Sequence, residues 1–157
     1  MLRSLFALIL LGLTSCVQIQ SNTRSGQLPS FRKMLVVLER PQDEVRESRQ
    51  LLKECPEGYT LCTVSYHPTL SFEDLPEFVR KQNEACQAQA TLIITRIPFA
   101  ARDYAYTAGH GTGYTFQLEL QSLPDALPIW KARIASQTEK IPARAIFRKL
   151  QQDGLLR

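Results

Sequence analysis

Five segments of the chain carry the hydrophobic pattern of β-strands. Residues 34–38 and 91–95 are near-continuous apolar runs, typical of strands buried on both faces of a sheet. In residues 114–121 apolar and polar side chains alternate strictly, which indicates a strand with one buried face. Residues 59–66, and the shorter alternation at residues 130–134, predict two more strands.

Three segments carry helical signals. Residues 42–54 follow a proline, have acidic residues early and Lys53 late, and are expected to bury a narrow stripe that includes Val45 and Leu52. Residues 71–88 begin with a capping sequence and show an amphipathic repeat. A third helix is expected to start at Pro142.

The predicted element order is β-α-β-α-β-β-β-α within one domain, residues 30–157. Strand–helix alternation implies parallel strands joined by crossovers, and the two closing hairpins add antiparallel strands. A glycine-rich turn at residues 108–113 separates the third and fourth strands. The fold class expected is therefore α/β (α+β): a mixed sheet packed with helices.

The amino terminus has the parts of a cleaved secretory signal, residues 1–15. Arg3 precedes a short apolar run, and small residues precede Cys16. The tetrad Leu13-Thr14-Ser15-Cys16 resembles the lipobox of bacterial lipoproteins, which implies cleavage before Cys16 and a lipid on its thiol. The alternatives are an ordinary signal with a chance cysteine, or a membrane anchor helix, for which the run is short.

The residues after Cys16 are polar. Residues 16–29 are predicted to be the lipidated cysteine and a flexible tether, the alternative being an extra edge strand around residues 17–20. Val17 follows Cys16 where an inner-membrane retention signal often carries aspartate. By resemblance to the sorting rule of two-membrane bacteria, this implies anchoring at the periplasmic face of the outer membrane.

Composition narrows the possible partners. The full chain is 44% hydrophobic with a net charge of +4, and removal of residues 1–15 takes away only Arg3, leaving 18 − 15 = +3. The apolar share is ordinary for a globular domain, and the mild, dispersed charge argues against nucleic-acid binding.

The order of elements also resembles small periplasmic lipoprotein domains. The segments Ala-Gln-Ala-Thr-Leu-Ile-Ile (88–94) and Ile-Trp-Lys-Ala (129–132), around a glycine-rich hairpin, resemble the curli-secretion and amino-terminal TolB type of domain and several lipoprotein families of unknown function. The resemblance covers most of residues 30–150 and implies no catalytic residues. The chain departs from those families in its three further cysteines.

Those three cysteines predict one disulfide and one leftover thiol, because the periplasm is oxidising. A Cys55–Cys62 pair is favoured and Cys55–Cys86 is the main alternative. Cys86 lies on the apolar stripe of its predicted helix, which favours a buried structural cysteine over a catalytic Cys86–histidine pair. With only His67 and His110 available, no metal site or cofactor is expected.

Aromatic residues gather around the glycine-rich turn. Tyr104, Tyr106, His110 and Tyr114 define a possible partner-binding arm, because aromatic residues are favoured at interfaces. The alternative is that these rings are ordinary cross-strand pairs.

The sequence therefore predicts a non-enzymatic envelope lipoprotein that binds or scaffolds an envelope protein. A hydrolase or thiol-based accessory, or a small-ligand carrier, is the alternative.

Overall fold

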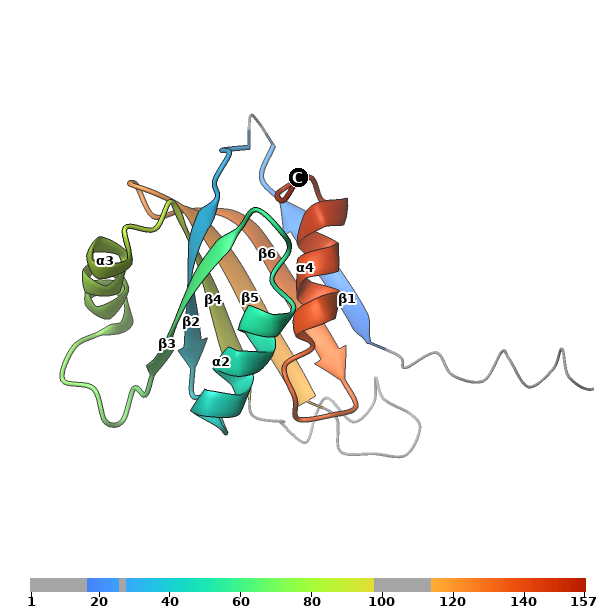
Figure 1. Cartoon of the computed structure of the whole chain (residues 1–157). Helices are drawn as coiled ribbons and strands as arrows, with labels where there is room; N and C mark the ends of the chain where they lie inside the picture. The colour runs from blue at the N-terminus through green and yellow to red at the C-terminus, as the bar shows by residue number, and fades with distance from the viewer. Residues whose placement is uncertain (1–16, 26–27, 98–113) are drawn as a thin grey trace, which may run out of the picture.

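The computed structural model describes residues 17–25, 28–97 and 114–157 (Figure 1). Six strands form one sheet in the spatial order β1-β6-β5-β4-β2-β3. The strands are β1 (Gln18–Thr23), β2 (Lys33–Glu39), β3 (Thr60–Tyr66), β4 (Ala90–Ile97), β5 (Tyr114–Ser122) and β6 (Leu127–Ser136). The described helices are α2 (Glu44–Lys53), α3 (Leu75–Cys86) and α4 (Ala143–Gln152).

The mixed α+β fold and its chain order are confirmed for the eight predicted elements. Strand β2 pairs in parallel with β3 and β4, as the strand–helix alternation requires. Strands β4, β5 and β6 pair antiparallel, as expected for consecutive hairpins. The strict alternation of β5 is also confirmed, because Phe116, Leu118 and Leu120 are buried on one face.

The predicted flexible tether is wrong over residues 18–23. These residues form β1, an element in addition to the eight that were predicted. It pairs antiparallel with β6, from Gln18↔Ala135 to Thr23↔Trp130. Ile19 packs against the main core, and the Ser21 hydroxyl donates a hydrogen bond to Asp153. The alternative of an extra edge strand therefore describes this segment, and the folded domain includes residues 18–23, which precede the predicted boundary at residue 30.

The main core lies between one face of the sheet and helices α2 and α4, which lie together in Figure 1. Trp130 of β6 is 1% exposed, and its indole nitrogen donates a hydrogen bond of 2.8 Å to Asp153 beyond α4. Burial raises the pKa of Asp153, but hydrogen bonds from Lys149, Trp130 and Ser21 outweigh it and lower the pKa overall. Asp153 therefore ties β1, β6 and α4 together as a carboxylate.

Helix α2 does not bury the stripe predicted for it. Val45 and Leu52 are exposed, and the helix instead buries Leu51 and Glu47. Glu47 is buried because Arg96 of β4 reaches it with a guanidinium–carboxylate contact of 2.6 Å. Arg96 also lies over the rings of Tyr114 and Phe116. A charged pair thus takes the place of an apolar contact, which a periodicity argument does not detect.

The opposite face of the sheet is covered at one side by α3. A smaller core joins Val79 of α3 to Leu35, Val37 and Ile93 of the sheet. Asp74 caps the helix by accepting a hydrogen bond from the Glu77 amide, and Pro76 lies in the first turn.

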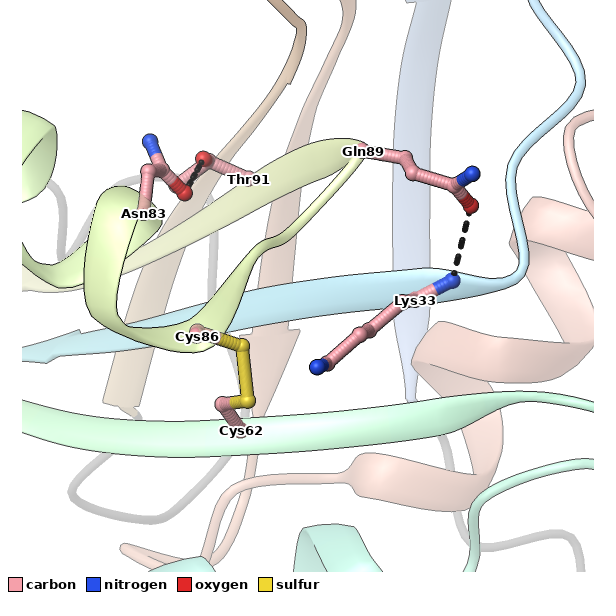
Figure 2. Close-up of a disulfide and its surroundings, with 6 residues drawn as sticks. All are labelled: Lys33, Cys62, Asn83, Cys86, Gln89 and Thr91. Atoms are coloured by element: carbon pink, nitrogen blue, oxygen red, sulfur yellow. Dashed lines mark hydrogen bonds between the residues drawn. A yellow bond between two sulfur atoms is a disulfide. The ribbon is translucent and has the colours of Figure 1, made fainter.

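Both pairings considered for the disulfide, Cys55–Cys62 and the alternative Cys55–Cys86, are wrong. Cys62 of β3 is bonded to Cys86 of α3, which fastens the end of the helix to the edge strand (Figure 2). Beside it, the Thr91 hydroxyl donates to Asn83, and the Lys33 amide donates to Gln89 (Figure 2). The expectation that Cys86 is a buried structural cysteine is confirmed, since it is 9% exposed.

Candidate groove and open sheet face

A groove of about 710 Å³ runs between α3 and the sheet. Its apolar part is formed by Leu75, Val79 and Ile93, and the β5–β6 turn adds Leu123 and Pro124. The groove exists because α3 packs over β3, β2 and part of β4, and no other described helix lies over β5 on this face. Its size falls within the range of about 300–1,000 Å³ that is usual for small-molecule sites.

Polar side chains line both walls of the groove. On the helix, Arg80 is held between Glu77 and Glu84 by contacts of 2.8 and 2.6 Å. On the sheet, Gln117, Glu119 and Gln121 of β5 face the same space. The groove therefore combines an apolar floor with hydrogen-bonding edges, a composition that suits an amphipathic ligand or a protein surface.

Beyond the groove, the same sheet face continues across β6 and β1 as an open polar surface. The pairing register aligns Gln117 with Arg133 and then Gln20, and aligns Glu119 with Lys131 and then Asn22. All of these except Glu119 are exposed. The surface is rich in side-chain amides, and it runs directly into the apolar groove.

Lys131 and Glu119 form an ion pair on the open sheet face. Lys131 lies 2.9 Å from Glu119 across the β5–β6 pair, and Gln121 also donates to that carboxylate. Burial raises the pKa of Glu119, but the hydrogen bonds from Lys131 and Gln121 outweigh it and lower the pKa overall. Glu119 is therefore an ionised, already partnered group and a poor candidate for a general acid.

The remaining thiol is an unpromising nucleophile. Cys55 is free, and burial raises its pKa. Its sulfur lies 3.6 and 3.5 Å from the carbonyl oxygens of Pro56 and Tyr59 as a hydrogen-bond donor. A reactive cysteine needs the thiolate at neutral pH, which this environment disfavours. The Cys86 thiol considered for catalysis is consumed in the disulfide.

Most of the predicted arm lies outside the described residues. Tyr104, Tyr106 and His110 belong to residues 98–113, and Cys16 likewise falls outside the described part. Tyr114 is described as the first residue of β5, half-buried, with the Arg96 guanidinium 5.9 Å from its ring centre. It packs against the main core, so its described role is structural.

Within residues 17–25, 28–97 and 114–157, no group of three or more histidine, cysteine or acidic side chains is arranged to hold a metal ion. His67 lies in the turn after β3, where its carbonyl accepts hydrogen bonds from the amides of Leu70 and Ser71. Of the helices in those same ranges, none has the length and apolar character needed to cross a membrane.

The groove and the open sheet face were not predicted from the sequence. The outward positions of β5 and β6 could be assigned to one face from their alternation. What the sequence did not reveal is that α3 covers only part of that face, because helix placement over a sheet depends on packing and not on a local pattern.

Comparisons with known proteins show a similarity of fold alone. Neither a family model nor a curated protein matches the chain. Among solved structures it is similar to a variant of PelC from Paraburkholderia phytofirmans, described as a dodecamer. That match has a TM-score of 0.50 and 11% identity, covering 90% of this chain and 100% of that one. A second PelC dodecamer structure from the same organism gives a TM-score of 0.43 and 11% identity, covering 78% of this chain and 83% of the other.

Proposed function

We propose that the chain is a non-enzymatic lipoprotein, anchored by lipid on Cys16 to the periplasmic face of the outer membrane, that works by binding other envelope components. The binding part of the proposal depends on one observation: of the described residues, no helix lies over β5, β6 and β1 on the sheet face beside α3, and this surface runs into an apolar groove. Exposed apolar surface bordered by polar groups is typical of interaction sites.

The state of the cysteines supports the non-enzymatic, exported reading over the thiol-based alternative. A Cys62–Cys86 disulfide suits the oxidising periplasm. The free Cys55 has its pKa raised by burial, which disfavours nucleophilic chemistry.

The partner that we propose first is a second copy of this chain. The similar PelC structure is described as a dodecamer, and on this chain the groove and the open sheet face offer two adjoining surfaces that a neighbouring copy could bury. An envelope protein of another kind is the broader form of the same proposal. Carriage of a small apolar ligand is the second candidate, favoured by the volume of the groove.

The anchor is tested by Cys16→Ala. We expect this variant to move from the membrane fraction to the soluble periplasm, because two or three acyl chains hold a protein firmly whereas the described helices provide no membrane span. Fractionation of cells, with mass spectrometry of the mature amino-terminal peptide, provides the measurement. Cys55→Ser is the matched control and should stay in the membrane. Membrane retention of Cys16→Ala would reject the anchor.

Self-association is tested on the acyl-free domain by analytical ultracentrifugation. Gln117→Arg puts bulk and charge on the exposed groove wall, and we expect it to weaken association at least about tenfold, which corresponds to about 1.4 kcal/mol. Gln151→Arg, an exposed change on α4, should have no effect. If the parent sediments as a monomer at all concentrations, the second-copy proposal fails. A monomer that retains a bound apolar molecule in native mass spectrometry would favour the carrier.

A further inference from the structure

Strand β1 fixes the position at which any lipid on Cys16 must leave the domain. Val17 is the single residue between Cys16 and β1, so a lipid on Cys16 is joined to Gln18 by a backbone link that spans at most about 8 Å. Gln18 pairs with Ala135, next to the last residue of β6. The anchor therefore leaves from the end of the sheet where β1 begins and β6 finishes, at the bottom of Figure 1.

Strands β2, β3 and β4 also finish at this end. Glu39 pairs with both Tyr66 and Thr95, and Ile97 at the end of β4 faces Thr115 near the start of β5. The segment 67–74, which joins β3 to α3, consequently lies at the same end (Figure 1).

This segment exposes the largest apolar side chains of the described surface. Phe72 is 107% exposed and Leu70 is 76% exposed, the two highest values among the large hydrophobic residues described. The segment is fixed by hydrogen bonds, since the Tyr66 hydroxyl donates to the Glu73 carbonyl and the Leu70 amide donates to that of His67. Val45, which is 65% exposed, lies in the first turn of α2, and this helix follows the end of β2.

The anchor and the exposed pair Leu70 and Phe72 lie at opposite edges of one end of the sheet. Strand β1 is one edge and β3 the other, with four strands between them. Five strand spacings of about 4.8 Å separate the two edges by roughly 24 Å. Two contacts so far apart would fix the tilt of the domain, which a single anchor cannot do.

We propose that this end of the domain rests on the lipid surface, with the acyl chains of Cys16 inserted at the β1 edge and Leu70 and Phe72 inserted at the β3 edge. The inference rests on the proposed function in that Cys16 carries the lipid. Because β1 is part of the sheet, no long spacer separates Cys16 from the folded domain. The bilayer that receives the acyl chains is therefore the surface closest to this end of the sheet. Exposed Lys140 borders the same end and can donate to lipid headgroups, as can Arg40, whose guanidinium lies 4.0 Å from Glu39 but is 55% exposed.

Quenching of tryptophan fluorescence by brominated lipids tests this placement. Phe72→Trp adds a reporter at the β3 edge, Asp125→Trp adds a control in the β5–β6 turn at the opposite end of the sheet, and the parent supplies the background of buried Trp130. Each protein is measured on vesicles, once with its native anchor and once as a Cys55→Ser variant whose Cys16 thiol is coupled to a maleimide lipid.

We expect the Phe72→Trp reporter to lose at least about half of its added emission, because interfacial apolar groups lie about 5–10 Å below the headgroup boundary. The Asp125→Trp reporter should match the background. An unquenched reporter at position 72, or equal quenching at both positions, would overturn the placement, and the first result would leave Leu70 and Phe72 to a protein partner. Absence of an acyl group from native Cys16 would reject the proposed function instead, while the maleimide-anchored protein still decides the placement.

Discussion

Replacing Arg96 with methionine is expected to destabilise the domain by about 3–5 kcal/mol, because it leaves the carboxylate of Glu47 buried without its partner. The side chains of Arg96 and Glu47 are 16% and 7% exposed, so water cannot replace the lost contact of 2.6 Å. Arg96 also donates to Gln42 and lies over Phe116, contacts that methionine can only partly replace. Urea denaturation followed by circular dichroism measures the change.

Two comparisons isolate the buried charge as the cause. Arg80→Met removes an arginine that also holds two carboxylates, but Arg80 is exposed, so we expect a much smaller loss. The double variant Arg96→Met with Glu47→Leu should recover much of the stability, since it removes both charges together. Equal losses for Arg96→Met and Arg80→Met would show that the buried pair does not stabilise the fold.

Removing the Cys62–Cys86 disulfide, by alanine at both positions, is expected to lower the free energy of unfolding by about 3 kcal/mol. The bond closes a loop with a sequence separation of 24, and opening it restores conformational freedom to the unfolded chain. The small core under α3 then has to hold the helix alone. Hydrogen exchange should therefore rise first in Leu75–Cys86, before the central strands β2 and β4.

The matched control for the disulfide is Cys55→Ser, which keeps the bond and should leave the urea midpoint of the oxidised protein nearly unchanged. Treatment of the parent with a thiol reductant should lower its stability as the double substitution does. If reduction has no effect on the midpoint or on exchange in α3, the helix is held by packing and the bond adds nothing measurable.

The sequence predicted the elements whose hydrophobic pattern arises from their own burial. The apolar runs in β2 and β4 reflect burial on both faces, and the alternation in β5 reflects a sheet with one core-facing side. Strand β1 was predicted only as the alternative to a flexible tether, because its residues are polar and, of them, only Ile19 packs against the core. Its order comes from β6 and from Asp153, which are distant in sequence.

The cysteine pairing and the groove could not be predicted for a related reason. Cys55 and Cys62 flank one turn, which made them appear close, but Cys62 points to the face of the sheet that α3 covers, and there it meets Cys86. The groove likewise depends on where α3 stops over β4. Both features are set by the position of one helix on the sheet, information that no local pattern contains.

The pairing of β1 with β6 has a consequence for the time at which the domain can fold. In the described sheet, β1 finds its strand partner only near the other end of the chain, and Asp153, which secures both strands, lies later still. A chain emerging from its amino terminus therefore cannot complete this sheet until almost all of it is available. The β1 edge of the sheet is therefore completed last, whereas strands β2, β3, β4 and β5 pair with one another without it.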